Sequence, residues 1–240
     1  MGREAALVAR ERIVAHRDPA PVRYPPERFA LLSRKRGRSR PFLDVLPEGS
    51  LLFGSLARGD VREASDIDIE VPQGVASFVV EVGLSRLDDP WGARTLVAAT
   101  PNSVVKAMWQ FGEVTVSLPL TPPSPLEEAF ARFGGAIDRR GAAEGLRVPG
   151  VDKRLLLIEP TPDGHIERSV CDRVEEAASI LGVDADVVRG RVRVLRRRAK
   201  SGRTGVYLTE PLDDAESPEE ALQRLKDGDP AVRRSASGSR

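Results

Sequence analysis

The chain has 240 residues, of which 40% are hydrophobic and 30% charged, and its 37 basic and 36 acidic residues leave a formal net charge of +1. This composition is typical of a soluble globular protein, and it excludes a uniformly basic or acidic protein, a wholly disordered chain and a membrane-spanning helix. One cysteine and two histidines exclude an internal disulfide and any cysteine- or histidine-based metal cluster, so a metal site would have to depend on carboxylates.

Two helices are predicted within the first 45 residues. The first covers Glu4–His16 and is ended by Asp18-Pro19. The second begins after Pro25-Pro26 and runs out in the segment 34–40, which holds five basic residues in seven. We interpret this basic segment as a solvated helix end followed by a loop.

Strand and helix patterns interleave between residues 50 and 133. Strands are expected at residues 50–54, 65–71, 95–99 and 113–118, and helices at 76–87, 103–111 and 126–133. A proline-rich break at 119–125 precedes the last of these helices. The glycine-containing segment 134–150 is expected to hold a domain boundary.

The C-terminal part opens with an expected strand at 154–158 and a turn at 160–164. His165 follows this turn, and we assign it no role. Two helices follow, and between them Gly182 suits a helix C-cap and Asp184 a helix N-cap. A strand at 204–208, a helix at 218–226 and a disordered tail at 233–240 complete the expected elements.

The most informative segment pairs a glycine turn with two carboxylates. Asp66 and Asp68 alternate with isoleucines, and this period of two places both carboxylates on one face of a strand. Two carboxylates on one face repel, and a divalent cation such as Mg²⁺ removes that penalty. The turn at Gly54-Ser55 allows close backbone approach and offers a hydroxyl and an amide to phosphates. Together these residues indicate a site for a metal-bound polyphosphate.

Gly54-Ser55, ten intervening residues and Asp66-Ile67-Asp68 resemble the signature of the DNA polymerase β-type nucleotidyltransferase superfamily, especially its minimal nucleotidyltransferase branch. The resemblance covers roughly residues 50 to 120. It implies a mixed sheet with helices on one side and transfer of a nucleoside monophosphate from an NTP to a hydroxyl. Carried over by residue, Asp66 and Asp68 would bind two Mg²⁺ ions, and Gly54 and Ser55 would contact the triphosphate. Arg58 is a further phosphate candidate.

The family also has a third, catalytic carboxylate on a later strand. Here Thr115 and Ser117 occupy the expected positions, while Glu113 lies on the same face two residues earlier. Glu113 could serve if the strand is shifted, or it could be a solvated residue at the start of the strand. If it is not a ligand, NTP binding can persist while transfer is weak or absent.

A second constellation is a basic helix pair. The helix from Ala185 to about Ala199 follows the Gly182 turn, and the pair resembles a helix-turn-helix, with the strand at 204–208 as part of a wing. The basic residues that could bind nucleic acid are Arg189, Arg191, Arg193, Arg196, Arg197, Arg198, Lys200 and Arg203. The alternative is a helical hairpin whose arginines are solvated or paired with the acidic segment 210–220.

The expected fold is therefore of the α/β (α+β) class, a nucleotidyltransferase-type mixed sheet with helices plus a smaller, mainly helical C-terminal region. Its expected divisions are an N-terminal helical segment (1–45), a nucleotidyltransferase-like domain (46–150), a strand with the helix-turn-helix-like region (151–210), and an acidic helix with a tail (211–240).

Two functions remain open. The leading hypothesis is an Mg²⁺-dependent nucleotidyltransferase that uses an NTP, two Mg²⁺ ions and an unidentified hydroxyl acceptor. The alternative is a catalytically weakened nucleotide- or nucleic-acid-binding protein. We find no secretory signal and expect a cytoplasmic protein with no membrane partner and an undetermined oligomeric state.

The chain is rich in arginine, with 32 arginines against five lysines, and poor in asparagine, glutamine and methionine. Heat adaptation is one interpretation of this usage, although the lysine enrichment that usually accompanies it is absent. A GC-rich genome would produce the same arginine bias, so a thermophilic origin remains a hypothesis.

Overall fold

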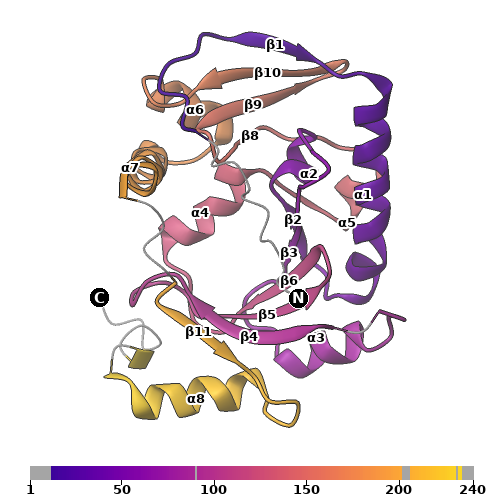
Figure 1. Cartoon of the computed structure of the whole chain (residues 1–240), viewed down its shortest axis with the longest axis vertical. Helices are drawn as coiled ribbons and strands as arrows, with labels where there is room; N and C mark the ends of the chain where they lie inside the picture. The colour runs from indigo at the N-terminus through magenta and orange to yellow at the C-terminus, as the bar shows by residue number, and fades with distance from the viewer. Residues whose placement is uncertain (1–11, 90, 202–205, 231, 234–240) are drawn as a thin grey trace, which may run out of the picture.

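The computed structural model describes residues 12–89, 91–201, 206–230 and 232–233, apart from the side chain of Ser201. These ranges contain both helices and strands, and the strands form two sheets. This mixture confirms the α/β (α+β) class. Figure 1 shows the smaller sheet at the top of the molecule and the larger one at the bottom, with the long helix α1 (Pro26–Val45) along one side. None of the helices described is both long enough and apolar enough to cross a membrane.

The larger sheet has seven strands in the order β11-β4-β5-β6-β3-β2-β7. All neighbours are antiparallel except β3 and β6, which are parallel. In spatial order the strands are β11 (Leu208–Pro211), β4 (Ala93–Ala98), β5 (Lys106–Phe111), β6 (Val114–Pro119), β3 (Ile67–Glu70), β2 (Leu51–Phe53) and β7 (Ala136–Asp138).

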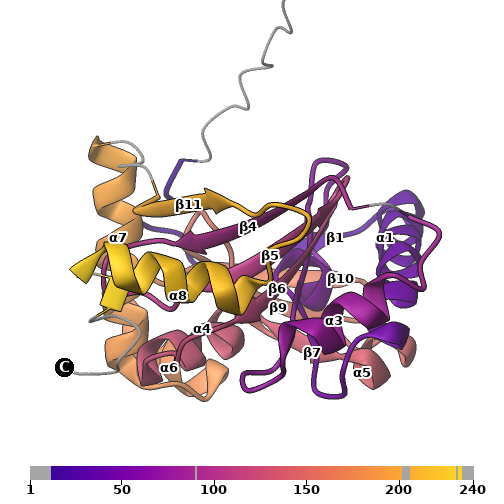
Figure 2. The same ribbon diagram turned by 90° about the horizontal axis from the view of Figure 1, so that it is seen from below.

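The two faces of this sheet differ in burial because its central strands alternate. One face buries large apolar side chains, among them Ile69, Leu96, Trp109 and Val116. It packs against α1, α3 (Ser77–Leu84) and α8 (Pro218–Gly228), and α3 and α8 lie on this side of the sheet in Figure 2. The opposite face, called here the open face, carries half-buried or exposed and mostly polar side chains. A two-faced sheet thus leaves one surface available for chemistry.

The smaller sheet is antiparallel and joins segments far apart in the chain. Its order is β1 (Ala20–Arg23), β10 (Gly164–Ser169), β9 (Leu156–Thr161) and β8 (Gly150–Val151). A second apolar core lies beneath it and includes side chains from α4 (Pro125–Gly134), α6 (Val174–Leu181) and α7 (Ala185–Ser201). Two short helices, α2 (Ser55–Arg58) and α5 (Arg139–Ala143), complete the described elements.

The pairing of β1 with β10 depends on Gly164. A Cβ atom there would lie 1.9 Å from the carbonyl oxygen of Val22. We expect Gly164→Ala to lower the free energy of unfolding by about 1–3 kcal/mol, because the new methyl group must push β1 away. Gly37→Ala is the control: Gly37 lies within α1 with no atom within 4 Å of its added Cβ, and alanine should stabilise it by about 0.5–1 kcal/mol. Urea unfolding of both variants tests this, and an unchanged midpoint for Gly164→Ala would contradict it.

Two expected helices differ from the structure. The helix expected to run out at 34–40 continues through Pro41 to Val45, because Phe42 and Leu43 are buried in the main core. The segment expected as a helix at 103–111 contains the strand β5 instead, with Ala107, Trp109 and Phe111 buried in alternation. In both cases tertiary packing outweighed the local pattern.

The ends of the chain and the expected divisions also differ. The helix predicted at Glu4–His16 falls partly on residues 1–11, outside the described ranges, and residues 12–16 are not helical. Residues 234–240 of the expected tail are likewise outside. The sheet pairings cross the expected divisions, because β1 pairs with β10 and β11 pairs with β4. β7 lies in the expected boundary segment but extends the large sheet through its pairing with β2. β11 pairs with β4 and is therefore not a wing of the helix pair.

Candidate functional site

Asp66 and Asp68 lie where the open face of the large sheet begins. Asp66 immediately precedes β3 and Asp68 lies on it; both are exposed, while Ile67 and Ile69 are buried on the other face. The Asp68 carboxylate is reached by solvent but crowded by protein, and this partial desolvation raises its pKa. The charge of Asp66 raises the pKa of Asp68 further. The two aspartates are thus close enough to repel, as the sequence predicted.

The glycine turn lies beside the start of β3. In the antiparallel pairing of β2 with β3, Leu52 is opposite Ile69, and continuing this register brings Gly54-Ser55 toward Asp66. Gly54 has a φ of 69°, which favours glycine, and its N–H donates to the carbonyl of Gly135 at 2.9 Å. The half-buried Ser55 opens the short helix α2. The turn therefore follows β2 at the end of the β2–β3 pair where β3 begins.

The side chain of Arg58 is buried and hydrogen-bonded within the protein. Its side chain is 7% exposed, and its guanidinium makes two hydrogen bonds to the carboxylate of Asp60, at 3.0 and 3.1 Å. A third bond joins Nη1 to the carbonyl of Gly134 at 2.6 Å. These bonds occupy the buried guanidinium, and contact of Arg58 with phosphate stays a prediction.

Glu113 is paired with a lysine of α1. Its Oε2 accepts a hydrogen bond from Nζ of Lys35, on α1, at 2.6 Å. Within the described part of the chain, no three acidic, histidine or cysteine side chains are grouped so that they could hold a metal ion. The structure therefore does not bring Glu113 into a three-carboxylate set. Thr115 is the residue of β6 opposite Asp68, and its Oγ1 donates to Oε1 of Gln110.

Lys35 and Arg36 belong to the segment that we expected to be solvated, but both are buried. Nζ of Lys35 also donates to the carbonyl of Ser65 at 2.7 Å, directly before Asp66. The guanidinium of Arg36 donates to the carbonyl oxygens of Leu56 and Leu146, and burial lowers the pKa of Arg36 to about 10. These two residues hold the loops on either side of the candidate site. Their helical context gave no signal of that role.

Two lysines lie close enough to Asp68 to lower its pKa, Lys153 more strongly than Lys106. Lys106 is paired with Glu70 on the open face of the sheet. Lys153 lines a cavity of about 120 Å³ between α4, α7 and β8, together with Phe130, Asp152 and Arg191. Lys153 is far from Asp68 in sequence, so spacing gave no reason to join them.

The two helices of the basic pair pack against each other around the Gly182 turn, as both interpretations of the sequence expected. Gly182 ends α6 in the left-handed conformation, with a φ of 62°, and Oδ1 of Asp184 accepts the N–H of Asp186 at 2.7 Å. α7 packs on α6 and α4. Arg191 lies over the ring of Phe130, 5.2 Å from its centroid. Arg203 lies outside the described ranges.

His165 is on strand β10 rather than in a turn before a helix. It is buried, and its Nδ1 makes a 2.6 Å hydrogen bond with the hydroxyl of Tyr24 on the segment after β1. Burial lowers the pKa of His165 and raises the pKa of Tyr24 to about 12. This pair belongs to the contact between β10 and the N-terminal segment, so we give His165 no catalytic role.

Comparisons of the chain with models of protein families, with curated proteins and with solved structures find no match.

Proposed function

We propose that this chain is a nucleotidyltransferase that binds a magnesium-bound NTP at Asp66, Asp68 and the Gly54-Ser55 turn. The observation that carries the proposal is the pair of exposed carboxylates beside that turn, whose mutual repulsion and partial desolvation raise the pKa of Asp68. Keeping two carboxylates ionised in such surroundings costs free energy, and such pairs commonly mark functional sites.

The donor set suits magnesium carried in with a nucleotide. Mg²⁺ binds through one or two carboxylates together with waters and phosphate oxygens, so Asp66 and Asp68 suffice for an ion that bridges to a triphosphate. The bound metal would offset charge on the transferring phosphoryl group. Gly54 would allow the phosphates close to the backbone, and Lys153 would add a positive charge on the far side of Asp68.

In the proposed reaction an acceptor hydroxyl oxygen forms a bond to the α-phosphorus of the NTP, and the bond from that phosphorus to the bridging oxygen of pyrophosphate breaks. The hydroxyl proton passes to solvent. Pyrophosphate would be the leaving group. This chain's contribution is to position the nucleotide and to stabilise charge.

A second candidate function is nucleotide binding without transfer. Two observations favour it: Glu113 is paired with Lys35, and an uncharged Thr115 stands opposite Asp68. A site with two carboxylates can hold a metal–nucleotide while lacking a third group to activate the acceptor. The two candidates share the binding step and differ only in turnover.

The test is to incubate the chain with each of the four α-³²P-labelled ribonucleoside triphosphates, with Mg²⁺ or with EDTA. The acceptors would be an RNA oligonucleotide with a free 3′-hydroxyl, glycerol and the chain itself. We expect label transfer that requires Mg²⁺. NTP binding without transfer to any of these acceptors would favour the second candidate, and absence of Mg²⁺-dependent binding would overturn both.

Glu113→Gln separates the roles of the carboxylates in the same assay. Because the Glu113 carboxylate is 46% exposed and is paired with Lys35, we expect the variant to keep NTP binding within about threefold of the unchanged chain, a change of less than about 1 kcal/mol. If the variant loses nucleotidyl transfer but retains NTP binding, Glu113 would be a catalytic residue together with Asp66 and Asp68.

A further inference from the structure

The exposed surface of α7 carries a group of basic side chains without acidic partners. Among the described residues, no acidic side chain pairs with the five that follow: Arg193, Arg196, Arg197, Arg198 and Lys200. Arg189, one turn earlier, is by contrast paired with Glu175 at 2.6 Å and Asp186 at 3.0 Å. The five unpaired residues are called here the α7 basic surface.

The acidic segment 210–220 does not neutralise this surface. Glu210 and Glu216 are both paired with Arg224. Glu219 accepts hydrogen bonds from Ser77, and Glu220 caps α8 through Ser217. The expectation that these acids could pair with the α7 arginines is therefore wrong for the described residues.

Stabilisation of the helix does not account for the α7 basic surface either. Basic residues favour the last turn of a helix because of the helix dipole. That effect accounts for Arg198 and Lys200 at the end of α7, but Arg193 lies well before the last turn. The cluster extends beyond what the helix itself requires.

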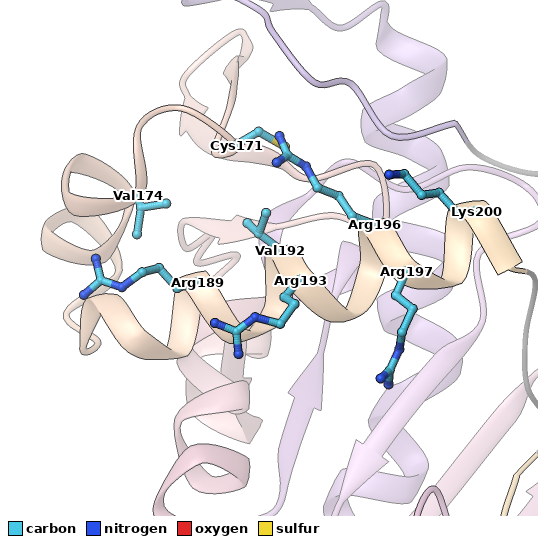
Figure 3. A pocket seen from close by; sticks show the side chains of 8 residues that line it. All are labelled: Cys171, Val174, Arg189, Val192, Arg193, Arg196, Arg197 and Lys200. Carbon is cyan, nitrogen blue, oxygen red and sulfur yellow. The ribbon is translucent and has the colours of Figure 1, made fainter.

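Four residues of the α7 basic surface, all but Arg198, line a hollow of about 530 Å³. In Figure 3, Arg196 and Lys200 extend toward the side where Cys171 lies, while Arg193 and Arg197 point the opposite way in this view, and all four line the hollow. From Arg193 to Lys200 the helix rises about 10 Å, at about 1.5 Å per residue, so the basic residues line a strip rather than a point.

We propose that the α7 basic surface binds nucleic acid through its sugar–phosphate backbone. A strip of unpaired arginines suits a chain of phosphates, since guanidinium groups form paired hydrogen bonds with phosphate oxygens. A membrane fits less well, because the apolar residues of α7, Val188 and Val192, are buried in the core instead of being free to enter a lipid surface.

The charge distribution along α7 indicates contact with phosphates rather than with base edges. A recognition helix in a helix-turn-helix reads bases with its N-terminal residues. Here that end carries the exposed carboxylates Asp184 and Asp186, and Arg189 is already paired. We therefore infer binding that is largely independent of sequence.

This inference stands apart from the proposed nucleotidyl transfer, because the assay needs neither NTP nor Mg²⁺. Fluorescence anisotropy would measure binding of the chain to labelled 20-nucleotide RNA and DNA strands, two unrelated sequences each, and to a DNA duplex. If five phosphates are neutralised on a single strand, the slope of log K against log salt is about −3.5, which weakens binding about a hundredfold between 50 and 200 mM salt.

The decisive variant is Arg193→Gln/Arg196→Gln/Arg197→Gln. It should reduce the slope to about −1.4, because two of the five contacts remain. The matched control is Arg86→Gln/Arg139→Gln/Arg140→Gln, which removes the same charge from exposed arginines elsewhere and should leave the slope unchanged. An equal loss of affinity in both triple variants would show only nonspecific attraction to the total charge of the protein, and it would overturn the proposal. A preference above about tenfold between unrelated sequences would overturn backbone recognition.

Cys171 supplies a second readout, since it is the only cysteine of the chain and lines the hollow. Bound oligonucleotide should slow its alkylation by N-ethylmaleimide at least fivefold, and the Arg193/Arg196/Arg197 triple variant should lose this protection. Unchanged alkylation at saturating oligonucleotide would contradict the proposed location. Stronger binding of polyglutamate, or of phosphatidylserine vesicles, than of any oligonucleotide would assign the surface to another partner.

Discussion

Replacing both Asp66 and Asp68 with asparagine is expected to weaken Mg²⁺-dependent NTP binding by more than about a hundredfold, since loss of groups merely adjacent to metal ligands already costs about 10–100-fold. Asparagine keeps the shape of each side chain but removes the charge that holds the cation. Equilibrium dialysis of each NTP, with Mg²⁺ or EDTA, measures the effect.

Stability separates this loss of binding from unfolding. Because the folded pKa of Asp68 is raised, ionising its carboxylate at neutral pH costs folding free energy, and Asp68→Asn removes that cost. The variant should therefore be at least as stable as the unchanged chain at pH 7. The difference should shrink as pH falls through the raised folded pKa of Asp68 and should vanish below the ordinary aspartate pKa of about 3.9, where the unfolded chain also takes up the proton.

The matched control is Asp88→Asn/Asp214→Asn, which removes two exposed carboxylates elsewhere and should leave NTP binding unchanged. If the Asp66/Asp68 variant folds and still binds NTP in a Mg²⁺-dependent way, the assignment of this site is wrong. If binding is lost together with the cooperative unfolding transition, Asp68→Asn alone decides the question, because that change is not expected to destabilise the fold.

Arg58→Met is expected to lower the free energy of unfolding by about 3–5 kcal/mol, the usual cost of removing one partner of a buried ion pair. Methionine fills much of the arginine volume but leaves the carboxylate of Asp60 buried and uncompensated, and it leaves the carbonyl of Gly134 without its donor. Urea unfolding monitored by circular dichroism measures the change.

Two further variants make this result specific. Arg58→Met/Asp60→Leu removes the unpaired charge and should recover much of the lost stability, because apolar replacements of buried pairs are often neutral. Arg140→Met breaks the exposed Arg140–Glu144 pair and should cost less than about 1 kcal/mol. Normal stability of Arg58→Met combined with weakened NTP binding would support Arg58 as a phosphate contact.

Local features of the candidate site were predictable because they depend on neighbours in the sequence. The alternation Asp66-Ile67-Asp68 follows from strand geometry, and the structure places the isoleucines inside and the carboxylates outside. The C-cap at Gly182 likewise follows from the freedom of glycine to adopt a positive φ. Each of these depends on only a few consecutive residues.

Other features were decided by contacts between distant segments. The segment 103–111 has short-range patterns compatible with helix, and pairing with β4 and β6 made its second half a strand. The sequence pattern predicted a solvated basic segment at 34–40. In the structure α1 continues past this segment, because Phe42 and Leu43 pack in the core. The burial of Lys35 and Arg36 followed from that extension.

The sequence by itself determined the pair of carboxylates, the glycine turn beside them and the density of arginine along α7. Only the tertiary structure decided which charges find partners: Glu113 with Lys35, Arg58 with Asp60, and Glu210 with Arg224 instead of with α7. The physical reason is that side-chain periodicity is a local property of the backbone, whereas an ion pair requires two side chains that the chain path brings within about 4 Å. The net charge of +1 is therefore a sum over ion pairs, whose charges cancel, and other charged residues, among them the unpaired residues of the α7 basic surface.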